Sequence, residues 1–136
     1  MQTDREHLST TEAVELQLPL NSEFWLLIRL TAAALASHAQ FGVEEIDDLR
    51  LAADELCLSV TDGDTRGPMR VQFFVGSESI EIECSVNGDS APGLPDREEA
   101  LWSKRILDAL VDEHGLEMQD GRRRAWLRKR RSSIPS

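Results

Sequence analysis

The spacing of apolar residues divides the first half of the chain into one strand followed by two helices. Residues 13–18 alternate between apolar and polar side chains, which predicts a half-buried strand that Pro19 ends. Residues 24–38 carry apolar side chains at helical spacing, and Asn21 or Ser22 can cap this helix. Its expected inward stripe is Phe24, Leu27, Ile28, Thr31 and Leu35.

A second helix is predicted over residues 46–60, after a break at Gly42. Its apolar residues recur every three or four positions, so one stripe can be buried while the opposite side faces water. Glu55 and Ser59, on that opposite side, are four residues apart and lie one turn above the other. An acid and a hydroxyl so placed belong either to a solvated face or to the edge of a site. The stripe expected to be buried is Ile46, Leu49, Ala53, Leu56, Cys57 and Val60.

The second half of the chain changes to a period of two, which predicts strands. Residues 69–75 and 80–86 alternate on either side of a turn at 76–77, so they read as a hairpin with one wet face. Two further strands are expected near the end of the chain, over 116–118 and 124–129.

A third helix is predicted over residues 96–113, after a loop of turn-forming residues at 87–95. The side chains expected to face inward from it are Leu101, Ile106, Leu110 and, as a further candidate, Trp102. The element order is therefore strand, helix, helix, strand, strand, helix, strand, strand.

This order predicts an α+β two-layer sandwich. Strands outnumber helices and are mostly joined by hairpins, so we expect a largely antiparallel five-stranded sheet with three helices on one face. A chain of 136 residues suits one compact domain. We place that domain at residues 13–130, between a flexible leader at 1–12 and a tail at 131–136.

Charge is distributed unevenly along the chain. Residues 122–136 hold seven basic residues and no acid, whereas the preceding 121 residues hold eight basic and 25 acidic residues, a net charge of −17. Such a body repels nucleic acid and favours a basic protein partner. The basic end is either a solvated segment that offsets the acidic body or a contact for nucleic acid. Of these, we expect the solvated segment, and no direct binding of nucleic acid.

Other residue types exclude several classes of function. No apolar run is long enough to span a membrane, and the leader lacks the apolar centre of a secretory signal, so we expect a cytoplasmic protein without a membrane partner. Cys57 and Cys84 are expected to be buried, reduced thiols, with a redox switch as the alternative. The three histidines are isolated and suggest no transition-metal site.

Three segments resemble the anti-sigma factor branch of the GHKL ATPases (gyrase, Hsp90, histidine kinase, MutL). Asp48-Leu-Arg-Leu-Ala-Ala-Asp-Glu55 is similar to the second helix of that family, and Ile106-Leu-Asp-Ala-Leu-Val-Asp-Glu113 is similar to its helix after the nucleotide lid. Arg29 resembles the first-helix arginine that contacts partners, and its distance in sequence to Glu55 also fits. The resemblance extends over residues 13–130 and is closest to degenerate, actinobacterial-type members. It implies a Bergerat-type fold.

The resemblance also implies roles for single residues. Glu55 matches the glutamate that activates the serine of the partner as a general base. Ser59 stands where the family has the asparagine that holds magnesium, so Ser59 is the candidate Mg²⁺ ligand. The remaining candidates for an ATP pocket are Asn87 or Asp89 at the adenine-reading aspartate, Gly93 in the same loop, and Ser103 where a glycine is expected.

Three of these nucleotide elements depart from the family pattern, which indicates that binding of ATP and Mg²⁺ is weak or lost. The resemblance then implies an anti-sigma factor that sequesters an alternative sigma factor of the stress or sporulation type. An anti-anti-sigma protein of the STAS type would antagonise it, and a homodimer is expected. Arg29 and Trp25, on one exposed side of the first helix, are the candidate partner contacts. The alternative is an active ATP-dependent serine kinase that phosphorylates the STAS protein.

Overall fold

The computed structural model describes residues 12–61, 65–88 and 97–132. Its elements follow the predicted order, and a short 3-10 helix precedes the first α-helix. The elements are β1 (Glu12–Leu18), η2 (Ser22–Phe24), α1 (Trp25–His38), α2 (Val43–Thr61), β2 (Thr65–Val75), β3 (Ser79–Gly88), α3 (Arg97–Leu110), β4 (Glu113–Gln119) and β5 (Arg122–Arg130).

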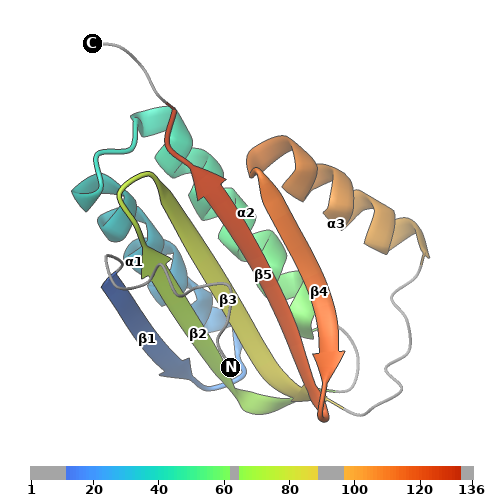
Figure 1. The fold of residues 1–136 in the computed structure, drawn as a ribbon. Helices are drawn as coiled ribbons and strands as arrows, with labels where there is room; N and C mark the ends of the chain where they lie inside the picture. The colour runs from blue at the N-terminus through green and yellow to red at the C-terminus, as the bar shows by residue number, and fades with distance from the viewer. Residues whose placement is uncertain (1–11, 62–64, 89–96, 133–136) are drawn as a thin grey trace.

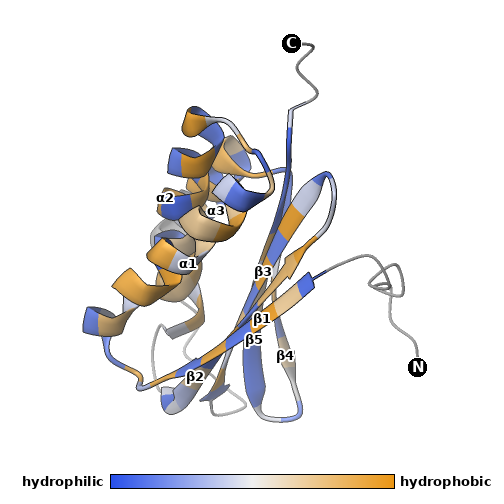
Figure 2. Cartoon of the chain, turned by 90° about the vertical axis from the view of Figure 1, so that its left-hand side faces the viewer, coloured by the Kyte–Doolittle hydropathy of each residue, from blue (hydrophilic) through white to orange (hydrophobic). Residues whose placement is uncertain are grey.

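The strands form one five-stranded sheet in the order β1-β2-β3-β5-β4, and every neighbouring pair is antiparallel. All three helices cover the same face of this sheet, as Figures 1 and 2 show from two sides. The predicted α+β two-layer sandwich is therefore confirmed.

The third helix is shorter than predicted, because sheet pairing competes for its last residues. Helix α3 ends at Leu110, and the backbone N–H of Asp112 donates to the carbonyl of Arg128 at 3.0 Å. Glu113 then starts β4 opposite Arg128 and accepts a hydrogen bond from its guanidinium at 2.6 Å. The predicted continuation of the helix to Glu113 was wrong.

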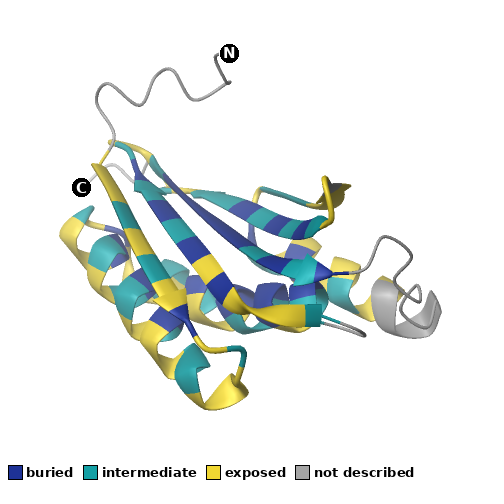
Figure 3. Cartoon of the chain, turned by 90° about the horizontal axis from the view of Figure 1, so that it is seen from below, coloured by how far each residue is buried: buried dark blue, intermediate teal, exposed yellow. Residues whose placement is uncertain are grey.

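The core lies between the helices and the inner face of the sheet, where buried residues alternate along the strands (Figure 3). Helix α2 is the middle helix of this layer and contributes more buried residues to the core than the described parts of α1 and α3 do. Its buried residues are Leu49, Ala52, Ala53, Leu56, Cys57 and Val60. The predicted stripe is thus confirmed except at Ile46, which is only half-buried.

The two outer helices match the predicted burial only in part. In α1 the buried residues are Ile28, Ala32 and Ala36, while Leu27 is 43% exposed. The small alanines let the α1 backbone approach the sheet and α2 closely, and Leu26, Leu27 and Leu30 are left outside. The predicted stripe is therefore confirmed at Ile28, and at Phe24 and Leu35, which are half-buried against the core; it was wrong at Leu27.

Helix α3 is rotated relative to the predicted orientation. Among the residues whose side chains are described, Leu107 is buried and Leu110 is half-buried. The expected inward residues Leu101, Trp102 and Ile106 are instead 50%, 62% and 37% exposed. The helix has apolar residues on two sides, and the sequence pattern does not decide which side meets the core.

The basic segment near the end of the chain is a strand and not a solvated tail. On the outer face of the sheet, Arg124 of β5 forms ion pairs with Glu83 of β3 at 2.9 Å and with Glu117 of β4. Arg128 pairs in the same way with Glu81 at 3.5 Å and Glu113 at 2.6 Å. Glu81 and Glu83 are only 6% and 7% exposed. The basic end thus offsets acidic residues, as expected, but it does so within the sheet.

Candidate functional site

The candidate base Glu55 lies where α2 and α3 meet. The hydroxyl of Ser103, on α3, donates a hydrogen bond to Oε2 of Glu55, and both side chains are half-buried. Because Ser103 and Leu107 are four residues apart, the turn of α3 that packs into the core also presents the hydroxyl to α2. The structure therefore brings together two residues that are 48 positions apart in the sequence.

Ser59 lies one turn further along α2 and is also half-buried. Its hydroxyl donates to the backbone carbonyl of Glu55 at 3.0 Å, a bond within the helix that many serines make. The oxygen keeps a lone pair, but it is a neutral ligand. Among the described residues, no group of three or more His, Cys, Asp or Glu side chains is arranged to hold a metal ion.

Asn87 is separated from Glu55 by the sheet. It lies on β3 directly opposite Arg122 of β5, and its Oδ1 accepts a hydrogen bond from Arg122 at 2.9 Å. The neighbouring Val86 points into the core, so Asn87 faces the outer side of the sheet, away from the helices. Asp89 and Gly93 lie outside the described residues.

Of the three candidate nucleotide residues that the structure describes, Ser59 and Ser103 lie beside Glu55 and Asn87 does not. A carboxylate that accepts a hydrogen bond from a hydroxyl has the geometry of a general base toward that hydroxyl. Here the hydroxyl belongs to the chain itself, and it occupies one oxygen of Glu55. The described residues do not form a set that fits Mg²⁺ and ATP.

Arg29 projects from α1 toward α2. Its Nη1 donates to both carboxylate oxygens of Asp54, at 2.8 and 3.1 Å, and its side chain remains 31% exposed. Asp54 is adjacent to Glu55, so the contacts Arg29–Asp54 and Glu55–Ser103 form one polar line across the three helices. Arg29 is thus a bridge between two helices that is still reachable from solvent.

Trp25 does not lie on the exposed side of α1 as predicted. Its side chain is half-buried and packs against the core, one turn before Ile28. The exposed apolar residues beside Arg29 are Leu26 and Leu30, at 48% and 53%. Of the two residues predicted to lie on the exposed side of α1, only Arg29 does so, and the exposed apolar side chains next to it are leucines.

The sequence analysis also missed exposed apolar residues on α2. Leu51 and Leu58 are 59% and 52% exposed and are seven residues apart, so they lie on one face. Both fall outside the stripe that was expected to be buried. A heptad spacing outside a buried stripe was the available signal for a second apolar face.

A charged cluster closes the gap between α3 and β4. Nε2 of His114 lies 2.7 Å from Asp108, which also pairs with Lys104 at 3.0 Å. The hydrogen bond from His114, followed by that from Lys104, lowers the pKa of the Asp108 carboxyl. These residues line part of a cavity of about 470 Å³ together with Trp126 and Arg128. Since Asp108 pairs with Lys104 and His114, and Arg128 pairs with Glu113, the cluster is explained as a structural contact.

None of the helices that the structure describes is long and apolar enough to cross a lipid bilayer.

No protein-family profile matches the chain. Among curated proteins it is similar to the serine-protein kinase RsbW of Halalkalibacterium halodurans, with 31% identity over 81 residues, or 58% of this chain and 50% of the relative. The serine-protein kinases RsbW of Bacillus pumilus and Bacillus subtilis are 32% and 28% identical over 88 and 86 residues, in each case 60% of this chain and 54% of the relative. The chain thus spans about half the length of the curated relatives it matches. Over somewhat more than half of its own length, it is similar to serine-protein kinases named RsbW.

Proposed function

We propose that this chain is an anti-sigma factor that sequesters an alternative sigma factor in the cytoplasm, with nucleotide binding weak or lost. The observation that carries the proposal is the contact between Ser103 and Glu55. The chain is similar in sequence to RsbW kinases, but the carboxylate of its candidate base Glu55 already accepts a hydrogen bond within the chain.

The partner surface in this proposal is the outer side of α1 and α2 around Arg29. An arginine flanked by exposed Leu26 and Leu30 has the composition of an interface anchor. The ion pair with Asp54 holds the guanidinium in a fixed position before a partner arrives. A STAS-type protein would compete for the same surface and release the sigma factor. The sequestering unit would be a homodimer, which sedimentation of the purified chain tests.

Loss of nucleotide binding is supported by the positions of three candidates. Asn87 faces the outer side of the sheet and is held by Arg122, while the hydroxyls of Ser59 and Ser103 are both donated within the helical layer. ATP would need these groups to turn toward one pocket.

Binding to the sigma factor is tested by a titration of wild type and Arg29→Glu. We expect the variant to bind at least several-fold more weakly, because it removes the anchor and places a carboxylate beside Asp54. Arg70→Glu is the matched control, since Arg70 is an exposed arginine that pairs with Glu15 at 3.2 Å on the outer face of the sheet, away from the helices. Equal affinity of wild type and Arg29→Glu would contradict the proposed surface.

The alternative is an active serine kinase that phosphorylates the STAS protein with Glu55 as base. The similarity to proteins named serine-protein kinase favours it. Calorimetry with ATP and magnesium separates the two readings. Heat of binding at micromolar nucleotide, together with phosphate transfer to a serine of the STAS protein, would establish the kinase. The same result would exclude an anti-sigma factor that works without nucleotide.

A further inference from the structure

Four exposed apolar residues lie around the contact between Glu55 and Ser103. Leu51 and Leu58 stand four residues before and three residues after Glu55, so they share its side of α2. Trp102 and Ile106 precede and follow Ser103 on α3 and are four residues apart. We call these four residues the α2–α3 patch; their exposed fractions are 59%, 52%, 62% and 37% in the order Leu51, Leu58, Trp102 and Ile106.

The two helices run antiparallel, which makes the patch continuous. Nζ of Lys129 contacts both the carbonyl of Leu110 and the carboxylate of Asp48, at 2.7 and 3.8 Å, so the end of α3 lies beside the first half of α2. The hydrogen bond from Ser103 to Glu55 places the middle of α3 beside the second half of α2. Figure 1 shows α2 and α3 side by side and running in opposite directions. By these two contacts, Ile106 lies opposite the turn that carries Leu51, and Trp102 lies near the turn that carries Leu58.

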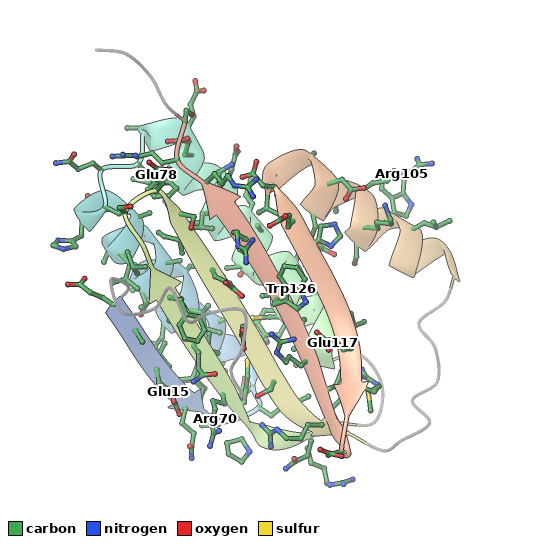
Figure 4. All side chains as sticks on the ribbon, viewed as in Figure 1. Glu15, Arg70, Glu78, Arg105, Glu117 and Trp126 are labelled. Carbon is green, nitrogen blue, oxygen red and sulfur yellow. The ribbon has the colours of Figure 1, made fainter. Side chains whose placement is uncertain are left out.

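Helix α2 gives the side of the molecule next to this patch a net negative charge, which the basic end of the chain offsets only in part. On the outer face of the sheet, Arg70 pairs with Glu15 at 3.2 Å (Figure 4), and Arg124 and Arg128 of β5 pair with acids of β3 and β4. From β5, Lys129 pairs with Asp48 of α2 at 3.8 Å.

Helix α2 carries six acids and one arginine over residues 43–61, a net charge of −5. Three of these acids have ion-pair partners, since Asp47 pairs with Arg50, Asp48 with Lys129 and Asp54 with Arg29. The six acids and these three basic partners still sum to −3, so exposed leucines and an exposed tryptophan lie on a helical layer whose middle helix stays net negative.

We infer that the α2–α3 patch docks a basic amphipathic helix of a partner protein. Leucine-type side chains of that helix would cover the patch, and its lysines or arginines would face the acids of α2. The inference rests on the proposed function only in that the sigma factor would supply this helix. The patch adjoins the surface around Arg29, because Asp54, the ion-pair partner of Arg29, lies between Leu51 and Leu58 on α2.

The test uses a synthetic peptide with leucines at helical spacing and lysines between them, labelled for fluorescence anisotropy. A permuted peptide of the same composition without the spacing is the control for charge alone. Wild type should bind the amphipathic peptide, and Leu58→Glu should weaken binding by about tenfold or more, because one apolar contact is lost. Since Leu58 is exposed, this substitution leaves the core intact.

Val43→Glu is the matched variant, because Val43 is 76% exposed on the same helix but outside the patch. Both variants add one negative charge. If the contact were purely electrostatic, both would bind the basic peptide as well as wild type does or better. That result, or equal affinity for the permuted peptide, would overturn the inference.

A second copy of the chain is the other occupant that the test addresses. If sedimentation shows a dimer that Leu58→Glu dissociates, the patch is a self-interface and the inference is wrong.

If the peptide binds as expected but no sigma factor binds the chain, the patch stands and the proposed function fails. If Arg29→Glu abolishes sigma binding while Leu58→Glu alters neither peptide nor sigma binding, the proposed function stands and the patch fails.

Discussion

Removal of the Ser103 hydroxyl tests whether α3 is held on α2 by a specific polar contact. Ser103→Ala deletes the donor to Glu55 and leaves the helix backbone unchanged. A hydrogen bond to a charged group contributes about 1.5–3 kcal/mol, and the half-burial of both residues favours the lower end, about 1.5 kcal/mol. Alanine is a better helix former than serine by about 0.5 kcal/mol, so the net loss of unfolding free energy is about 1 kcal/mol.

The assay is urea denaturation followed by tryptophan fluorescence. With a slope of about 2 kcal/mol per molar urea, a loss of about 1 kcal/mol lowers the midpoint by about 0.5 M. Ser59→Ala is the matched control, because Ser59 is also half-buried but donates only to a carbonyl of its own helix. We expect the midpoint of Ser59→Ala to stay at the wild-type value or to rise slightly. If Ser103→Ala behaved like Ser59→Ala, the contact with Glu55 would contribute nothing to stability.

Three further predictions concern packing, pH and thiol chemistry. Gly115→Ala should lower the unfolding free energy by about 1–3 kcal/mol, because a Cβ there would lie 2.7 Å from Nε1 of Trp126. In Gly42→Ala the Cβ would lie 3.5 Å from a flexible glutamate side chain, so this control should lose less unfolding free energy in the same denaturation assay. The pKa of the Asp108 carboxyl is lowered by hydrogen bonds from His114 and Lys104. The stabilisation by Asp108 should therefore be present above the ordinary pKa of 3.8 and vanish as pH falls through the lower pKa of the folded state. Denaturation of wild type and Asp108→Asn across acidic pH checks this, and a difference in stability that persisted in strong acid would refute it. The hydrogen bond with Cys57, together with burial, raises the pKa of the Cys84 thiol well above its ordinary value. Both cysteines are buried, so iodoacetamide should label neither of them until denaturant is added. Mass spectrometry of the native and the unfolded chain after labelling measures this.

The sequence predicts this fold well where periodicity and burial coincide. The stripe of α2 is confirmed almost completely, because its outer side carries mostly acids and only two leucines. In α1 and α3 apolar residues occur on both sides, and a count of large hydrophobic residues does not select the buried one. Close packing selected Ala32 and Ala36 in α1, and this choice depends on the neighbouring α2 and not on α1 itself.

The candidate site shows the same limit at the level of single residues. The position of Asn87 could have been predicted, since the alternation that places Cys84 and Val86 inward places Asn87 on the outer face. The contact between Ser103 and Glu55 could not, because it depends on the rotation of α3 over α2. The pairing of Arg124 with Glu83 likewise needs the strand order β3-β5-β4, which local sequence patterns do not contain.

In the proposed function, the helical layer captures a sigma factor without the help of nucleotide. The most direct measurement is the affinity of the purified chain for each alternative sigma factor of its own cell, with and without ATP and magnesium. We predict that one sigma factor binds at micromolar concentration or tighter and that nucleotide leaves this affinity unchanged. Binding that appears only when ATP and magnesium are present, or binding to none of the sigma factors, would contradict the account.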